Sequence, residues 1–570
     1  MSIGFLRPAF VILVFLFAVG PTAAQSISLA GEWRFALDRA DAGVNDQWFS
    51  RALHDRIRLP GVLQAQAHGD EISTTTPWVL SLYDRFWFLR EDYKAYGKPG
   101  NVKAPFLSQP PRHYLGVAWY QRDIEIPREW SGRRVVLFME RPRWESTVWV
   151  NARRIGSNLS LSAPHVYDLG KLAPGRHQLS VRVDSRMLMP YRPDAHSVSD
   201  SLASSWNGII GTIELRATTP VWIDDAQVFP NIAKKSVLIK VEVGNLTEET
   251  GRGTLSVGSV SVPVSWDEKG GRTQFEVSLG KDAQLWDEFS PVLNRLDLRL
   301  LGTQADDRRE LVFGLREFGA EGNEFVINGR KTHLRGTHHG GDFPLTGYPP
   351  TDVESWRRIL RISKEWGLNH IRFHSWAPPK AAFEAADELG IYLQPEPGMW
   401  NEISPGTPME KMLYEETERM IKEFGNHPSF VLFSASNEPK GHWKKSLPRW
   451  AEHFRREDPR RLYTTGTGHT DREIPDPMEG AGYLVLQRLG QKMLRGNSAW
   501  FGRDYRQSLV DINIPVVSHE LGQWVAYPDY EIIKKFTGYM RPSNYEVFRD
   551  SMAARGLLAK NADALYSAER

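Results

Sequence analysis

Residues 430–439 read FVLFSASNEP, and this stretch decides the fold. Its first four residues are apolar and strand-forming, which predicts a buried β-strand. The pair Asn437-Glu438 follows, where that strand would leave the core. A charge at the end of a buried strand is costly unless it is paired or faces a pocket, and parallel barrels gather their catalytic groups at the C-terminal strand ends. An Asn-Glu pair is common by chance, but its position makes Glu438 a candidate catalytic acid.

A second apolar run ends in a carboxylate in the same way. Residues 514–522 read IPVVSHELG, and Trp524 lies shortly after Glu520. Two such glutamates suit retaining glycoside hydrolysis, in which one protonates the leaving oxygen and the other attacks the anomeric carbon. Their pKa values must then differ, so that one is protonated while the other is ionised. The alternative is that each glutamate caps its strand or pairs with an arginine at the barrel rim.

Length and composition describe an ordinary globular protein of several domains. The chain has 570 residues, enough for about three domains, with 41% hydrophobic and 25% charged residues. The net charge of +2 gives no reason to expect a nucleic-acid partner. Twenty tryptophans could stack on sugar rings, although β-sandwich cores also use tryptophan heavily.

The N-terminus predicts export. Arg7 precedes an apolar stretch, residues 10–20, that is too short to span a bilayer comfortably, and small residues precede a cleavage point before Gln25. We therefore expect a signal peptide over residues 1–24 and no stable membrane insertion after cleavage; an uncleaved anchor is the alternative. The chain has no cysteine, so disulfides are excluded, which favours a bacterial periplasm while leaving secretion open.

Two β-rich domains are expected before residue 319. Short alternating runs separated by Gly, Pro, Asn and Asp predict a jelly-roll sandwich over residues 25–218. The same style continues over residues 219–318, a length that suits an immunoglobulin-like sandwich.

From residue 319 to 570, apolar strands alternate with amphipathic helices, which predicts a parallel (β/α) barrel. No dinucleotide or phosphate-binding glycine loop follows any strand. The predicted strands are 332–337, 370–374, 391–395, 430–434, 462–465, 483–486 and 515–519.

An eighth strand is missing from this pattern. The residues after Glu520 are typical of helix or loop, with periodic segments at 545–553 and 562–570. Seven strands would leave unpaired edges in the barrel. We favour a truncated barrel over a strand that the pattern fails to reveal.

Motifs along the chain resemble glycoside hydrolase family 2, which includes β-galactosidases, β-glucuronidases and β-mannosidases. They occur in that family's domain order, from about residue 27 to the C-terminus. The motifs are 29–35 (LAGEWRF), 148–151 (VWVN), 313–316 (FGLR), 334–336 (LRG), 369–372 (NHIR), 436–439 (SNEP) and 519–520 (HE).

The resemblance implies roles for individual residues. Glu438 would be the general acid/base, Glu520 the nucleophile, and Asn437 a hydrogen-bond partner of the substrate 2-hydroxyl. Arg372 would keep the nucleophile ionised, since a nearby cation lowers a carboxylate pKa. Tyr483 could donate a hydrogen bond to the nucleophile.

Other polar and aromatic residues at strand ends are candidate substrate contacts or rim packing. They are His338, His339, His374, Glu396, Trp400 and Trp524. Adjacent histidines cannot easily bind one metal ion, so no metal site is expected. No cofactor is indicated.

The two glutamates favour a retaining glycosidase, and the resemblance implies an exo-β-glycosidase acting on a glycoside or oligosaccharide, most similar to β-galactosidases. Residues 337–350 depart from the usual family pattern, and no Asn-Lys pair marks recognition of a glucuronate carboxylate. The alternatives are an inactive or carbohydrate-binding relative with an unclosed barrel, and an inverting hydrolase with carboxylates about 6.5–9.5 Å apart. A homo-oligomer is compatible with the sequence.

Overall fold

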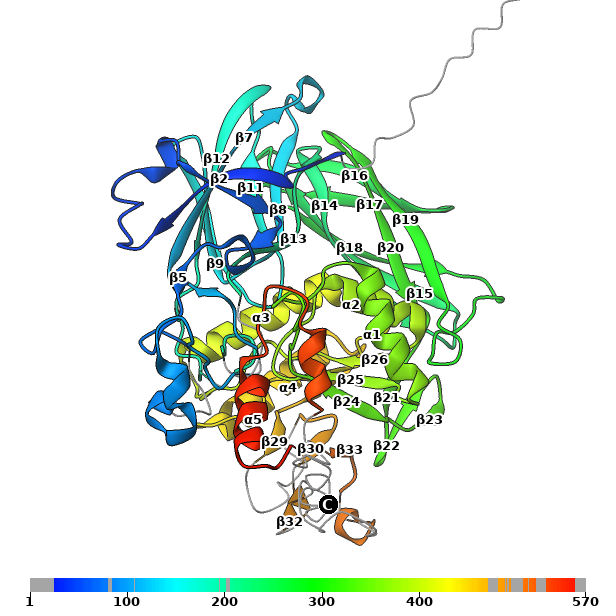
Figure 1. The fold of residues 1–570 in the computed structure, drawn as a ribbon. Helices are drawn as coiled ribbons and strands as arrows, with labels where there is room; N and C mark the ends of the chain where they lie inside the picture. Colours follow the sequence, from blue (N-terminus) through cyan, green and yellow to red (C-terminus); the bar gives the residue numbers. More distant parts are fainter. Residues whose placement is uncertain are drawn as a thin grey trace, which may run out of the picture.

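The computed structural model comprises two β-sandwiches packed on an α/β barrel (Figure 1). It describes residues 25–79, 85–106, 108–193, 195–200, 206–469, 480–486, 488–489, 492–493, 506–510, 512–518 and 529–558.

The first sandwich pairs two antiparallel sheets around one apolar core. One sheet has the order β1 (Gln25–Ser28), β13 (Gly208–Thr218), β8 (Arg134–Pro142), β11 (His165–Gly170), with β4 (Gly61–Val62) on β13. The other has the order β10 (Arg153–Leu159), β9 (Glu145–Val150), β12 (Gly175–Asp184), β7 (Val117–Ile126), β2 (Gly31–Asp38), β3 (Asp55–Leu59). Trp33, Tyr120 and Val148 are buried between the sheets, as expected where alternate strand residues face inward.

Two long connections leave this sandwich. Residues 185–207 join β12 to β13. The connection between β4 and β7 carries η2 (Gln64–Gln66), β5 (Asp70–Glu71), η3 (Trp87–Leu89), η4 (Glu91–Gly97) and β6 (Arg112–His113). The short helices η1 (Trp48–Ser50) and η5 (Arg128–Trp130) complete the domain.

The second sandwich is built from seven strands. Their order is β17 (Val260–Trp266), β16 (Gly251–Val257), β19 (Leu293–Gly302), β20 (Ala305–Gly314), β14 (Val221–Asn231), β15 (Ser236–Asn245), β18 (Gly271–Ser278). Strands β16 and β17 form a hairpin, in which the chain reverses at Gly258, whose φ of +57° suits glycine.

The barrel strands are parallel and follow one another around the sheet. They are β24 (Gly336–His339), β25 (His370–Phe373), β26 (Tyr392–Gln394), β27 (Leu432–Ser434), β28 (Leu462–Thr464), β29 (Thr467–His469), β30 (Leu484–Leu486) and β33 (Val516–Ser518). These strands form three hydrogen-bonded groups, β24 to β26, β27 with β28, and β29 with β30 and β33. The isolated parallel bridges Leu393–Phe430 and Asn437–Thr467 join the three groups. Strands β28 and β29 are consecutive parts of one stretch of chain and share one place in the barrel. The eight labelled strands therefore fill seven strand positions.

Helices α1 (Val353–Glu365), α2 (Lys380–Leu389), α3 (Pro408–Phe424) and α4 (Trp443–Glu457) connect the strands. Sequence signals account for their ends. Asp352 caps α1 by accepting from the Ser355 N–H at 2.8 Å, and Gly390 ends α2 with φ +69°. A hairpin of β21 (Phe318–Glu321), β22 (Glu324–Ile327) and β23 (Arg330–Thr332) precedes the barrel, and its Phe325 packs with Tyr392 and Tyr483.

The predicted first barrel strand is displaced. Residues 332–337 were expected, but Thr332 pairs back on Phe325 in the hairpin and the strand begins at Gly336. The other predicted strands agree with the structure to within two residues.

Within the described residues after β33, the chain forms η8 (Tyr530–Lys535) and α5 (Ser543–Ala554), in line with the helix predicted over 545–553. Residues 519–528 and 559–570 lie outside the described part, so the truncated barrel stays a prediction. Short elements β31 (Arg488–Leu489), β32 (Lys492–Met493) and η7 (Arg506–Leu509) precede β33.

Buried polar contacts hold the three bodies together. Trp286 of the second sandwich donates its indole N–H to the Asp387 carbonyl at 2.8 Å, and Arg316 donates to the carbonyl of Pro428 at 3.0 Å. From the first sandwich, Arg141 donates to the Ala377 carbonyl at 2.6 Å. Helix α5 lies near the connection between β4 and β7 (Figure 1), where Tyr96 donates to Asp550 at 2.9 Å. None of the described helices is long and apolar enough to cross a membrane.

Candidate active site

Asn437 and Glu438 follow strand β27 and lie at the C-terminal end of the barrel strands. Asn437 is fully buried, whereas Glu438 is partly exposed. The Glu438 N–H donates to the Thr467 carbonyl at 2.7 Å, and the Asn437 N–H donates to the Met399 carbonyl at 2.9 Å. Glu438 has φ +34°, outside the region that residues with a side chain usually occupy. Such strain persists only where the surroundings hold it, and it concentrates at functional sites.

A buried network joins four residues, Arg372, Glu396, Asn437 and Thr467, which we call the Arg372 network. The Arg372 guanidinium donates from Nε to Glu396 Oε1 at 2.7 Å, and from Nη2 to Asn437 Oδ1 at 2.7 Å and Thr467 Oγ1 at 2.6 Å. These residues come from β25, from the segment after β26, from the segment after β27 and from β29. All four side chains are at least nine-tenths buried. The folded barrel therefore assembles one rigid polar cluster beside Glu438.

The orientation of the Asn437 amide follows from this network. Arginine can only donate hydrogen bonds, so the amide oxygen must face Arg372 and Nδ2 must point away. Within the described residues, Asn437 Nδ2 has no hydrogen-bond partner. It is a donor available to a ligand.

Histidine and tryptophan rings form one wall of the site. The ring of His374, after β25, lies 5.4 Å from Trp400 and 5.5 Å from His338, centroid to centroid. His374 and Trp400 are buried, whereas His338 is exposed. These three predicted residues lie together, and rings of this kind can both pack against and hydrogen-bond a sugar.

The first sandwich completes this wall with a loop that the sequence did not reveal. His196 lies 4.5 Å from His374, ring to ring, and its Nδ1 is 2.7 Å from the Gly340 carbonyl. Arg192 lies over the Trp400 ring at 5.4 Å, and its backbone N–H donates to Asn401 Oδ1 at 2.7 Å. The loop belongs to another domain, and no motif or periodicity marks it.

Two predicted contacts differ from the rest. His339 packs among Phe343, Phe373 and Trp376 outside the barrel, because the residue after His338 points to the opposite face of the strand; burial lowers the pKa of His339 to about 4. Tyr483 precedes β30 and is fully buried in the barrel core, where burial raises its pKa. The His339 ring is therefore not at the site, whereas the hydrogen bond predicted from Tyr483 to Glu520 stays a prediction, because Glu520 lies outside the described residues.

Glu520 and Trp524 lie outside the described residues, so the separation of the two glutamates remains a prediction. Among the described residues, no group of three or more His, Cys, Asp or Glu side chains could hold a metal ion.

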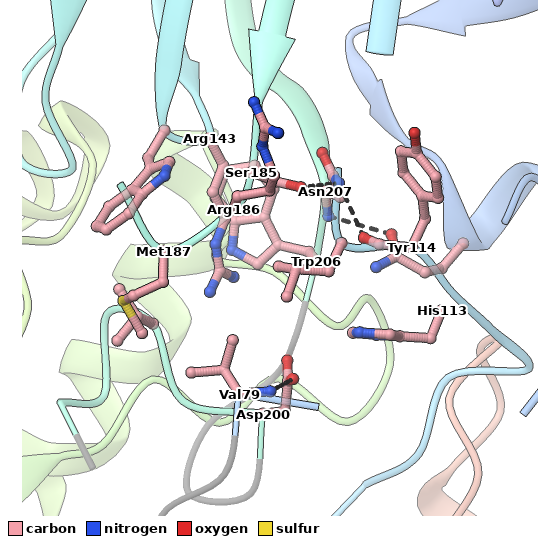
Figure 2. Close-up of a pocket in the computed structure, with 14 residues that line it drawn as sticks. Val79, His113, Tyr114, Arg143, Ser185, Arg186, Met187, Asp200, Trp206 and Asn207 are labelled. Carbon is pink, nitrogen blue, oxygen red and sulfur yellow. Dashed lines mark hydrogen bonds between the residues drawn. The ribbon is translucent and has the colours of Figure 1, made fainter. Parts of the chain in front are cut away.

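A separate small cavity lies where the two long connections of the first sandwich meet (Figure 2). His113, Arg143, Asp200 and Trp206 line it, and Asp200 accepts from the Val79 N–H at 2.6 Å. Its volume of about 20 Å³ holds one water molecule and no sugar. Such a water would satisfy one of the two His113 ring nitrogens, neither of which has a hydrogen-bond partner in the described structure. We therefore regard this cavity as structural.

Known proteins resemble this chain in sequence and in fold. Residues 319–479 match the glycosyl hydrolases family 2, TIM barrel domain. A β-glucuronidase from Paenibacillus borealis is 23% identical over 470 residues, covering 76% of this chain and 72% of the relative. A β-galactosidase from Arthrobacter sp. (strain B7) is 24% identical over 445 residues, covering 73% of this chain but 40% of the relative, so the chain spans less than half of that protein.

The solved β-glucuronidase from Ruminococcus gnavus in complex with D-glucuronic acid has the same fold, with a TM-score of 0.65 and 18% identity over 94% of this chain and 90% of that one. The matched domain agrees with the barrel described above. These comparisons support a member of the glycosyl hydrolases of family 2, and the family model itself matches the barrel over residues 319–479.

Proposed function

We propose that this protein is a retaining exo-β-glycosidase in which Glu438 is the general acid/base and Glu520 the nucleophile. The observation that carries the proposal is the placement of Glu438 beside the Arg372 network at the end of β27. The Glu438 carboxyl is partly exposed and can reach a ligand. The neighbouring Asn437 amide is held by Arg372 through Oδ1, which leaves Nδ2 to donate to a ligand.

In the proposed reaction, the Glu438 carboxyl protonates the glycosidic oxygen while Glu520 attacks the anomeric carbon, so the aglycone leaves and a covalent glycosyl-enzyme forms. Glu438 then takes a proton from water, which attacks the same carbon and releases Glu520. Asn437 Nδ2 would donate to the substrate 2-hydroxyl, a contact that strengthens as the ring becomes oxocarbenium-like.

We infer a β-galactoside as the preferred substrate class, since the sequence lacks the Asn-Lys pair expected for glucuronate. A β-glucuronide is the second candidate, because Arg192 places a cation over Trp400 at the wall of the site. Initial rates on 4-nitrophenyl β-galactoside and 4-nitrophenyl β-glucuronide distinguish the two.

Azide products test the two catalytic roles. In Glu438→Ala, azide should attack the glycosyl-enzyme formed from a 2,4-dinitrophenyl glycoside and yield the β-glycosyl azide. In Glu520→Ala, azide should replace the nucleophile and yield the α-glycosyl azide. Full activity of Glu438→Gln on a substrate with a poor leaving group would refute the acid/base role.

The other expectations have direct tests. An inverting mechanism would appear as an inverted anomer in the first product observed by NMR. Sugar binding without hydrolysis of any activated β-glycoside would favour the inactive relative. We also propose export to the periplasm or beyond, which cell fractionation and N-terminal sequencing of the mature protein would check.

A further inference from the structure

We propose that Thr467 is a positioning residue: it orients the Asn437 amide and holds the backbone on which Glu438 is presented. The inference rests on the proposed function, because Asn437 and Glu438 are the groups that Thr467 would position. Thr467 lies at the start of β29, on the stretch of chain that runs parallel to the segment carrying Asn437 and Glu438.

The main chain of Thr467 brackets Asn437. Its N–H donates to the Ser436 carbonyl at 2.9 Å, and its carbonyl accepts from the Glu438 N–H at 2.7 Å. Asn437 is thus held between two backbone hydrogen bonds to one residue. This arrangement fixes the turn in which Glu438 adopts φ +34°.

The Thr467 side chain is the meeting point of the Arg372 network. Its Oγ1 accepts from Arg372 Nη2 at 2.6 Å and lies 3.1 Å from both Glu396 Oε1 and Asn437 Oδ1. A hydroxyl carries one proton, so it can donate to only one of those two oxygens at a time. The Ser436 carbonyl, 3.3 Å away, is a third acceptor within reach. Donation to Asn437 Oδ1 ties the amide directly to Thr467, and in the other cases Arg372 Nη2, which donates to both Oγ1 and Oδ1, links the two side chains.

Removing this hydroxyl has a specific consequence. Among the described contacts, Arg372 Nη2 would lose the shorter of two acceptors, and Asn437 Oδ1 would be held by Arg372 alone. Asn437 Nδ2 would then no longer be fixed against the substrate 2-hydroxyl. Because that contact strengthens in the transition state, the loss should fall mainly on kcat.

Neighbouring threonines supply a matched control. Thr464 and Thr465 are as fully buried as Thr467, and their hydroxyls make no hydrogen bond within the described structure. Threonine to valine is isosteric at each position. Thr464→Val therefore reports the loss of a buried hydroxyl from this part of the barrel without a change in the network.

The experiment compares Thr467→Val, Thr467→Ser and Thr464→Val on an aryl β-glycoside and on its 2-deoxy analogue. A hydrogen bond to a charged group contributes about 1.5–3 kcal/mol, so kcat of Thr467→Val should fall by about 10- to 100-fold with little change in KM. Thr467→Ser should recover to within about fivefold of wild type, and Thr464→Val should change by less than about twofold. On the 2-deoxy substrate, the loss caused by Thr467→Val should shrink to about threefold or less, because the contact it supports is absent.

Equal losses on the two substrates would overturn the proposal and leave Thr467 a structural residue. A wild-type protein that hydrolyses no glycoside would refute the proposed function instead. Crystal structures of Thr467→Val and Thr467→Ser then decide the positioning role without turnover. The role requires the Asn437 amide to shift or rotate away from Arg372 in the valine variant only, and an unchanged amide would refute it.

Discussion

The buried pair Arg372–Glu396 should be strongly coupled in stability. The Arg372 Nε and Glu396 Oε1 atoms are 2.7 Å apart, and the two side chains are 7% and 0% exposed. At an effective dielectric constant of 20, unit charges about 4 Å apart attract by about 4 kcal/mol. Much of this attraction offsets the cost of desolvating both groups, so the pair adds little net stability, yet losing one partner removes the attraction and leaves the desolvation cost of the other group in place.

We therefore expect Arg372→Met or Glu396→Gln alone to destabilise the barrel by about 3–5 kcal/mol. The double variant should cost no more than either single change, because it removes both charges. The resulting coupling energy should be at least about 2 kcal/mol. Hydrogen exchange of peptides covering β25 to β27, read by mass spectrometry, measures local opening of the barrel separately from the sandwiches.

The exposed pair Arg357–Glu388 is the matched control. Its atoms are 2.6 Å apart, but both side chains are 40% exposed, so the same cycle should give less than about 1 kcal/mol. Additivity within about 0.5 kcal/mol at Arg372–Glu396 would refute the reasoning, because it would show that the two charges do not depend on each other.

Three further perturbations have defined outcomes. Arg192→Gln should lower kcat/KM for a β-glucuronide by about tenfold or more and leave a β-galactoside within about threefold, because only the former carries a carboxylate; equal effects would contradict a charge contact. Burial lowers the pKa of His370 to about 4. Between about pH 6.5 and pH 4 the imidazole is therefore protonated in the unfolded chain but neutral in the folded one, so the free energy of unfolding should fall by about 1.4 kcal/mol for each pH unit of acidification in this range. His370→Asn should flatten that slope in calorimetric melts, and an unchanged slope would assign it to other groups. Trp286→Ala should destabilise the contact between the second sandwich and the barrel by about 3–5 kcal/mol, whereas Trp286→Phe, which loses the hydrogen bond to Asp387 and keeps the ring, should cost about 1 kcal/mol; hydrogen exchange of α2 would separate them.

Strand positions in the barrel were predictable because buried parallel strands are short apolar runs with polar residues at their ends. The stretch 430–439 illustrates this, since its strand and both polar residues lie where the pattern predicts. The first strand was misplaced because residues 330–337 fit a strand anywhere along their length, and only pairing with the β22 strand assigned Thr332 to the hairpin.

The direction of each side chain was harder to predict from the sequence than the position of each strand. His338 and His339 are equivalent in sequence, yet one faces the other site histidines and the other packs among aromatic rings outside the barrel. Tyr483 is fully buried, and the sequence did not predict that burial. His196 and Arg192 reach the site from a different domain, so no pattern within the barrel could indicate them.

The sequence by itself determined the kind of fold and the candidate acid Glu438, because strand and helix periodicity and a charged strand end are local properties of the chain. The tertiary structure alone decided which groups act together. The Arg372 network draws on four separate segments and needs hydrogen-bond distances near 3 Å, and only closure of the sheet brings those segments to that separation. Thr467 shows the difference most clearly: in the sequence it is one of several threonines between residues 464 and 470, and in the folded barrel it lies between the main chain of Glu438 and the side chain of Arg372.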